Sequence, residues 1–288
     1  MLFSFTRHAW SNRSQGDKGI VNTTADKKRL NLTKRLLTCP ELTAINDAMN
    51  GVYVWALGRS MQSDAVRKGI YFVKRDMVPI FEDRLTAVVK ELNESLIPAF
   101  IAAYPAAKEA MKLPAENGGL GDLYVEGDYP APEQLRRAFS IQWAWLALSV
   151  PDELPDEVRT REITKLRESF EQAQEEIKFA LRESFQQVVA HAIECLTPNP
   201  DGTPKMFRAS SVNFDGFFET FHAKSMVDDN ELIALVDRAR EIIRGMPDPA
   251  RLRKSTTLRA QTAAQFAEVN HILDDLVSDK PNRMFCFD

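Results

Sequence analysis

The longest helical pattern in the chain runs from Asp156 to Leu196, which reads DEVRTREITKLRESFEQAQEEIKFALRESFQQVVAHAIECL. Its apolar stripe consists of Ile163, Leu166, Phe170, Ala173, Ile177, Leu181, Val188, Ala192 and Leu196. Glutamate, glutamine, arginine and lysine fill the other faces, and neither proline nor glycine interrupts the stretch. The pattern therefore predicts one amphipathic helix, about 60 Å long at ~1.5 Å per residue.

A helix of that length needs a partner along its side, because a single helix is only marginally stable in water. Residues 76–103 carry a second long stripe at the same spacing, with Pro98 predicting a kink or break near its end. A shorter helix is expected from Pro40 to Gly58. We expect residues 41–196 to form a long antiparallel, coiled-coil-like hairpin, with residues 113–155 as a loop and strand insert.

Two short segments have the character of β-strands. Residues 69–73 form an apolar run after a glycine, and residues 139–147 alternate apolar and small or polar side chains. Phe139, Ile141, Trp143 and Trp145 share one face of the second segment. We expect a small β element in which these two strands pair with each other.

The ends of the chain differ from its middle. Residues 1–40 include a polar stretch with Gly16 and Gly19, and they predict a loosely structured N-terminal arm. Residues 205–288 predict a C-terminal bundle of shorter helices, at about 211–224, 229–244 and 248–277. Together these expectations give a mainly α fold with a small β element.

Composition narrows the class of protein. The chain has 288 residues with 37 basic and 41 acidic side chains, so the net charge of −4 disfavours a general nucleic-acid coat. The three cysteines lie far apart without a CxxC pair, which is typical of a reducing compartment and predicts a cytoplasmic protein. Residues 1–10 lack the apolar core of a signal peptide, and no window is apolar enough to span a membrane.

One pair of residues suggests a metal. Glu219 and His222 stand three residues apart on an expected helix, and di-iron bundles use two such pairs with two further glutamates. His191 and Glu194 have the reverse order, and His271 precedes Asp274. Because a metal site needs several converging ligands, ordinary surface pairing is favoured over a metal-dependent enzyme, and no cofactor is expected.

Two basic clusters offer a nucleic-acid interface. The first comprises Lys27, Lys28 and Arg29 with Lys34 and Arg35, and the second comprises Arg251, Arg253, Lys254 and Arg259. Either cluster could contact phosphates. The alternative function is therefore a nucleic-acid-associated protein of a phage or mobile element, although solvated surfaces are favoured because aromatic side chains are not interleaved with these charges.

Recognisable catalytic motifs are missing from the sequence. Gly118-Gly119-Leu120-Gly121 lacks the Lys-Ser/Thr that follows a phosphate loop, and the cysteines have no partner motif. The leading hypothesis is therefore a non-enzymatic helical adaptor or assembly protein, with a protein partner or a second copy on its surface. The candidate interface residues are Trp143, Trp145, Phe170 and Ile177.

The order of several short motifs resembles an uncharacterised bacterial, plasmid and phage family, number thirty-one fifty among the domains of unknown function. The motifs are Trp10-Ser11-Asn12-Arg13, Gly69-Ile70-Tyr71-Phe72-Val73, Met77-Val78-Pro79, Phe100-Ile101-Ala102-Ala103-Tyr104, Leu120-Gly121-Asp122-Leu123-Tyr124, Asp128-Tyr129-Pro130, Phe139-Ser140, Val150-Pro151 and Met206-Phe207-Arg208-Ala209-Ser210. The resemblance covers most of the chain. It implies no catalytic residues, and it implies work beside MoxR-type AAA+ ATPases and von Willebrand A-domain proteins.

Overall fold

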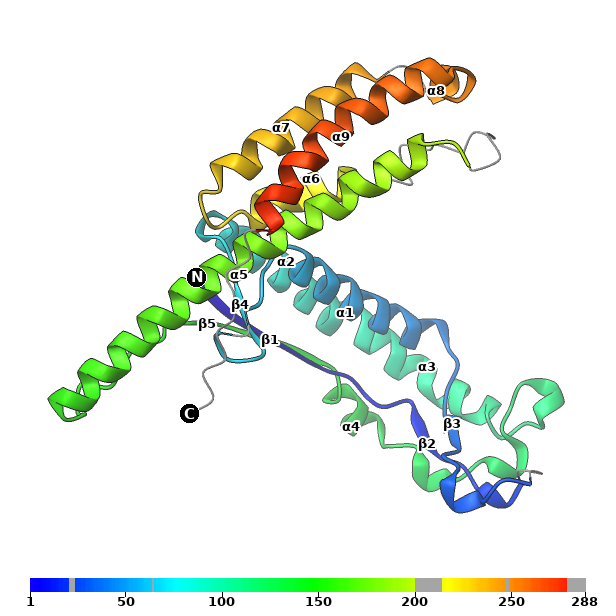
Figure 1. The fold of residues 1–288 in the computed structure, drawn as a ribbon. Helices are drawn as coiled ribbons and strands as arrows, with labels where there is room; N and C mark the ends of the chain where they lie inside the picture. Colours follow the sequence, from blue (N-terminus) through cyan, green and yellow to red (C-terminus); the bar gives the residue numbers. More distant parts are fainter. Residues whose placement is uncertain (21–23, 64, 200–213, 247–248, 279–288) are drawn as a thin grey trace. The chain divides into compact units, whose positions relative to one another are not determined.

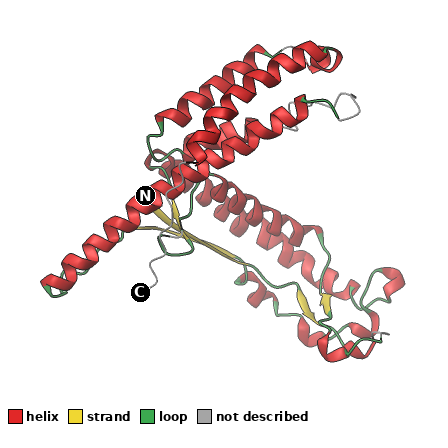
Figure 2. Cartoon of the chain, in the orientation of Figure 1, coloured by secondary structure: helices red, strands yellow, loops and turns green. Residues whose placement is uncertain are grey.

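The computed structural model describes residues 1–20, 24–63, 65–199, 214–246 and 249–278 (Figure 1). The fold is mainly helical with a small sheet, as the sequence predicts (Figure 2). The chain divides into two compact units. Unit 1 comprises Met1–Leu2, Gly58–Arg75 and Leu146–Asp288, and unit 2 comprises Phe3–Leu57 and Asp76–Trp145. This two-part division differs from the expected division at residues 1–40, 41–196 and 205–288.

Unit 1 is built on helix α5, which runs unbroken from Asp156 to Leu196 as predicted. Its neighbours in unit 1 are α9 (Thr256–Ser278), along which it packs, and α6 (Phe214–Lys224) (Figure 1). Helices α7 (Asn230–Gly245) and α8 (Pro249–Lys254) pack on α9. The long helix thus finds its partner in the C-terminal helices of its own unit.

The expected hairpin between residues 76–103 and α5 is not confirmed. Residues 76–103 lie in unit 2, where Phe81, Leu85 and Phe100 of their stripe are fully buried. That apolar surface is therefore used in a core of its own. The stripes predicted two amphipathic helices correctly, but a stripe specifies which face is buried and not which helix covers it.

Aromatic and aliphatic side chains from every helix of unit 1 form its core. The rings of Phe185 on α5 and Phe217 on α6 stack with their centroids 4.9 Å apart, and Phe214 stacks on Phe266 of α9 at 5.3 Å. Arg259 of α9 is buried and donates from Nη2 to the Cys195 carbonyl at 2.8 Å. This contact satisfies a backbone acceptor that the end of a helix leaves unpaired.

The helix expected at 248–277 is two helices, α8 and α9, separated at Ser255. The Oγ atom of Ser255 accepts a hydrogen bond from the backbone N–H of Leu258 at 3.2 Å. This is the bond that an N-cap serine makes at the start of a new helix, so the serine ends one periodic run and begins another.

Unit 2 contains the helices that precede β5. Helix α1 has the predicted bounds Pro40–Gly58. Helices α2 (Val78–Glu91) and α3 (Ile97–Ala110) are joined by one π turn, Leu92–Leu96, in which the N–H of Ile97 bonds to the carbonyl of Leu92. A widened π turn thus takes the place of the break expected at Pro98. The helical segment continues past Ala103 and ends at Ala110. A short helix, α4, spans Pro132–Arg136.

The strands form two small sheets. The order in the larger one is β4 (Ile70–Phe72), β1 (Leu2–His8) and β5 (Ser140–Leu146), so β1 stands between the two strands that were expected to pair. In the smaller sheet, β2 (Arg13–Gln15) runs antiparallel to β3 (Thr33–Arg35), with Ser14 opposite Lys34. Turns of 3-10 helix lie at Lys18–Ile20, Lys27–Arg29, Arg75–Met77, Ala115–Asn117, Gly121–Leu123 and Glu126–Asp128.

The expectation of a loosely structured arm at residues 1–40 is wrong for its first strand. Leu2, Phe3 and Phe5 of β1 are buried, and Phe3 lies edge-on against Phe81 with centroids 5.3 Å apart. Phe3 and Phe5 share one covered face of the strand, and Leu2 is buried on the opposite face. Among the described helices, none is both long and apolar enough to cross a bilayer.

Candidate functional site

The first half of α5 is the most exposed part of unit 1's longest helix. Residues 156–172 of α5 include no buried side chain, whereas Ala173 and Ile177 are 0% and 2% exposed. This half extends beyond α6, α7 and α9 (Figure 1). The second half of this 41-residue helix thus packs against other helices of unit 1, whereas its first half does not pack against α6, α7 or α9.

The apolar stripe continues into this exposed half. Ile163 is 41% exposed, and Leu166 and Phe170 are half-buried. Phe170 meets Phe72 edge-on, with ring centroids 6.1 Å apart. The apolar residues from Ile163 to Phe170 are three and four positions apart, and the same spacing continues to Ala173 and Ile177. One apolar seam therefore runs along α5 from a solvent-facing segment into the packed core. We call Ile163, Leu166 and Phe170 the open seam.

Opposite charges flank the open seam. In the heptad that places Ile163 and Phe170 at position a and Leu166 at d, Glu162 falls at g and Arg167 at e. Glu162 is bonded to Lys165 at 2.9 Å and to Arg161 at 3.2 Å. Hydrogen bonds from Lys165 and then Arg161 hold the pKa of Glu162 below its usual value, so this carboxylate is charged at neutral pH.

The other candidate interface residues lie elsewhere. Trp143 and Trp145 of β5 are half-buried in unit 2, and both indole N–H groups donate to Oε1 of Glu82, at 2.8 and 2.5 Å. Ile177 belongs to the core of unit 1 with Leu181. Of the four residues proposed from sequence, Phe170 alone belongs to the open seam; the seam residues Ile163 and Leu166 were missed as interface candidates although both belong to the predicted stripe.

Within the part of the chain that the structure describes, Glu219 and His222 do not belong to a cluster of three possible metal ligands. Glu219 forms an ion pair with Arg59. His222 is exposed, and its carbonyl accepts a hydrogen bond from Lys74 at 3.3 Å. Across the described residues, no cluster of three or more histidine, cysteine or carboxylate side chains could hold a metal ion.

Each basic cluster contains both exposed and buried side chains. Lys27, Lys28 and Arg29 are exposed on a 3-10 turn, and Arg251 and Lys254 are exposed on α8, whereas the side chain of Arg253 lies outside the described residues. Lys34 is buried and pairs with Asp128 at 2.7 Å. Arg259 is buried and bonds to α5 carbonyls. Two members of the clusters therefore support the fold.

Cys195 is the one cysteine of α5, and it lies near a histidine. The Nε2 atom of His191 is 3.6 Å from the Cys195 sulfur, and Nδ1 is 3.7 Å from a carboxylate oxygen of Glu194. All three stand in the last turns of the helix.

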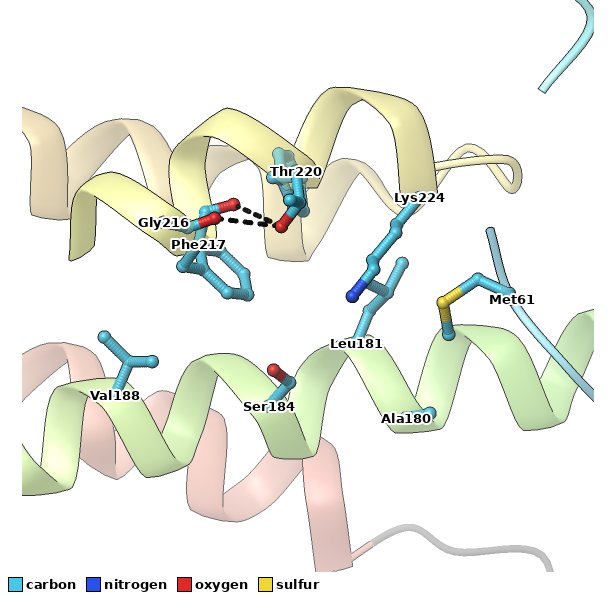
Figure 3. A pocket seen from close by; sticks show the side chains of 10 residues that line it. Met61, Ala180, Leu181, Ser184, Val188, Gly216, Phe217, Thr220 and Lys224 are labelled. Atoms are coloured by element: carbon cyan, nitrogen blue, oxygen red, sulfur yellow. Dashed lines mark hydrogen bonds between the residues drawn. The ribbon is translucent and has the colours of Figure 1, made fainter. Parts of the chain in front are cut away.

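A pocket lies between α5 and α6 in unit 1 (Figure 3). Its volume is about 220 Å³. The space exists because some of the residues around it have small side chains, and larger apolar side chains form other parts of its lining. The pocket is lined by Met61, Ala180, Leu181, Ser184, Val188, Gly216, Phe217, Thr220, Phe221 and Lys224. This site could not be predicted from the sequence, because its residues come from three separate segments.

Lys224 carries the positive charge of this pocket. Its side chain extends from the end of α6 toward Leu181 on α5 (Figure 3). Among the described residues, none forms a hydrogen bond or ion pair with its amine. Burial, followed by the positive charge of Arg59, lowers the pKa of Lys224. A partly desolvated cation favours an anion beside it.

Comparison of the chain with family models, curated proteins and solved structures finds no match. The family suggested by the motif order therefore stays a prediction.

Proposed function

We propose that this chain is a helical assembly protein, and that the first half of α5 binds the same segment of a second copy. The observation that carries the proposal is the continuity of one heptad seam. Its C-terminal part is covered by the chain's own helices, and its N-terminal part, at Ile163, Leu166 and Phe170, lies beyond them. Covering such a seam with another helix removes apolar surface from water.

Charge complementarity selects a second copy as the occupant. In a parallel two-stranded coiled coil, position g of one helix faces position e of the next heptad on the other. Glu162 at g and Arg167 at e meet this requirement in both directions across a twofold axis. Two identical segments would therefore align Ile163, Leu166 and Phe170 with their counterparts and pair opposite charges on both sides.

Sedimentation velocity over a range of concentrations tests this function. The wild-type chain is expected to self-associate, and Leu166→Glu is expected to sediment as a monomer, because a carboxylate at d would be desolvated without a partner. Lys254→Glu, an exposed substitution on α8, serves as the matched control and should associate like the wild type. A wild type that remains monomeric at every concentration, or a Leu166→Glu variant that still associates, contradicts the proposal.

The family resemblance adds two further partners to this proposal. It implies that assemblies of the chain act beside a MoxR-type AAA+ ATPase and a von Willebrand A-domain protein. Co-expression with the genes adjacent to its own, followed by purification through a tag on this chain, tests that part. Recovery of a stoichiometric ATPase supports it, and recovery of the chain without one contradicts it.

A further inference from the structure

We propose that the two-stranded ribbon of β2 and β3 in unit 2 binds double-stranded DNA, with its exposed face in the major groove. The inference rests on the register of the two strands and on the side chains that each face carries. It does not depend on self-association through the open seam.

One face of the ribbon is used by the fold. Strands β2 and β3 lie side by side in unit 2 (Figure 1). Ser14 of β2 donates to Asp128 at 2.9 Å, and Lys34 of β3 pairs with the same carboxylate at 2.7 Å. Lys34 also donates to the carbonyl of Leu123 at 2.6 Å. These bonds attach the ribbon to the segment between α3 and α4.

The opposite face of the ribbon is exposed. Because side chains alternate across a strand, this face carries the first and last residues of each strand: Arg13, Gln15, Thr33 and Arg35. The register places Arg13 directly opposite Arg35. Like charges in that position are destabilising, and no residue in the described part of the chain forms an ion pair with either guanidinium. The two arginines thus lower the stability of the ribbon, and an anionic partner would remove this repulsion.

The four exposed side chains are of the kinds that recognise base pairs. Arginine donates two parallel hydrogen bonds to guanine, glutamine pairs with adenine in the same way, and threonine contacts polar base edges or the thymine methyl group. Residues two apart on a strand are separated by ~6.8 Å, about twice the ~3.4 Å spacing of bases along a DNA strand. Arg13 and Gln15 therefore match bases two steps apart, and Thr33 and Arg35 do so on the second strand.

The dimensions of the ribbon favour DNA over RNA. The major groove of B-DNA is ~12 Å wide and admits a two-stranded ribbon, whose strands are ~4.8 Å apart. The major groove of an RNA helix is too narrow for side chains to read its bases. A DNA duplex is therefore the nucleic acid that fits this face.

The segment that contains the ribbon also carries the positive charge that DNA requires. Residues 13–35 include seven basic and two acidic side chains, although the whole chain has a net charge of −4. Asp17 and Asp26 each accept a hydrogen bond from a backbone N–H, at 2.7 and 2.9 Å. Lys28 and Arg29 are exposed on the 3-10 turn between the strands. Such cations beside the ribbon supply the phosphate contacts that position a protein on a duplex.

Fluorescence anisotropy with the full chain and a short labelled duplex of mixed sequence tests the proposal. Binding should be saturable at low salt. Between about 50 and 200 mM salt the affinity should fall roughly 100-fold, as expected when four cations each neutralise one phosphate. The cations of the connection between the strands are Lys18, Lys27, Lys28 and Arg29. A single strand of the same length should bind roughly tenfold more weakly, because it has no groove.

Variants separate the ribbon from general attraction by charge. Arg13→Gln combined with Arg35→Gln should weaken duplex binding roughly tenfold or more. The melting temperature of this variant should equal or exceed that of the wild type, since the substitutions remove the pair of like charges. Arg251→Gln combined with Lys254→Gln removes two exposed cations of the other basic cluster. This matched control should bind the duplex like the wild type.

A second pair of substitutions tests the phosphate contacts. Lys28→Gln combined with Arg29→Gln should reduce the slope of log affinity against log salt by about two, since each phosphate contact contributes about one. An unchanged slope in this variant would contradict the placement of the connecting turn on the DNA backbone.

Three other results would overturn the proposal. The first is the absence of saturable duplex binding at low salt. The second is equal duplex affinity of the wild type and the Arg13→Gln, Arg35→Gln variant, or an equal loss in the α8 control. The third is equal affinity for duplex and single strand, or tighter binding to vesicles of a negatively charged lipid than to the duplex, because the groove would then play no part.

Discussion

Arg182 of α5 and Asp229, which precedes α7, form a buried two-pronged ion pair. The Nε atom of Arg182 donates to one carboxylate oxygen of Asp229 at 2.7 Å, and Nη2 donates to the other at 2.9 Å. Nη2 also donates to Glu231 at 2.8 Å, and Nη1 donates to the carbonyl of Leu276 on α9 at 3.2 Å. One guanidinium thus connects three helices of unit 1. Its planar group donates several hydrogen bonds in fixed directions, which the ammonium group of a lysine does not.

Removal of this guanidinium should destabilise unit 1 strongly. Arg182→Met leaves the carboxylate of Asp229 buried without its cation, and breaking a buried pair in this way costs about 3–5 kcal/mol. Urea unfolding followed by circular dichroism measures the change. Arg161→Met, an exposed arginine on the same helix, is the matched control and should cost less than ~1 kcal/mol. Equal losses in both variants would show that the ion pair contributes little.

The same pair predicts a loss of stability in acid. Burial alone would raise the pKa of Asp229, but the hydrogen bonds from Arg182 and from the Leu232 N–H, with the charge of Arg182, outweigh burial and lower the pKa below 3.8. Because the folded pKa is the lower one, the stabilisation is complete above the unfolded pKa of ~3.9 and is lost as pH falls through the folded pKa. The free energies of unfolding of wild type and Asp229→Asn should therefore converge as pH falls below about 4. A constant difference would contradict this pKa shift.

Glu82 of α2 should control the fluorescence of two tryptophans in unit 2. Its Oε1 atom accepts from both Trp143 and Trp145, so Glu82→Ala leaves two half-buried indole donors without their partner. We expect a shift of tryptophan emission to longer wavelength and a loss of about 1–3 kcal/mol. Glu82→Gln keeps an acceptor oxygen at the same place and should change both quantities less. An unchanged emission spectrum in Glu82→Ala would count against the shared acceptor.

Arg259 should stabilise the end of α5. Its Nε and Nη2 atoms donate to the carbonyls of Leu196 and Cys195 at 3.1 and 2.8 Å. Arg259→Met removes both donors from buried acceptors, at a cost of about 1–3 kcal/mol. Hydrogen exchange should then become faster in the last turn of α5, whereas Arg251→Met, an exposed neighbour on α8, should leave that turn protected.

The long helices could be predicted because their pattern is long and uninterrupted. Both ends of α1 and α5 agree with the predicted residues, since proline, glycine and the polar breaks mark them. The partner of α5 could not be predicted, because a stripe specifies which face is buried and not which helix covers it. The division at Ser255 follows from a single capping hydrogen bond, which a periodic pattern does not indicate.

Strand β1 and the candidate site could not be predicted, because the local sequence patterns that belong to them are too weak. Phe3 and Phe5 alternate with Ser4 and Thr6 at the start of β1, so a signal for this strand exists, but it spans few residues. In the candidate site, the stripe of α5 included Ile163 and Ile177 alike. Burial separates them at 41% and 2%, and that difference depends on where the other helices of unit 1 end. The pocket around Lys224 requires two helices and Met61 to come together, which no local pattern indicates.

Pairing of the open seam between copies is tested most directly with two charge variants, Glu162→Arg and Arg167→Glu. Each variant alone places like charges at both g and e contacts of its own dimer, so each is expected to sediment as a monomer. A mixture of the two restores opposite charges at both contacts and should sediment as a heterodimer. Two variants that associate alone as the wild type does, or a mixture that stays monomeric at concentrations where the wild type is dimeric, would contradict the account.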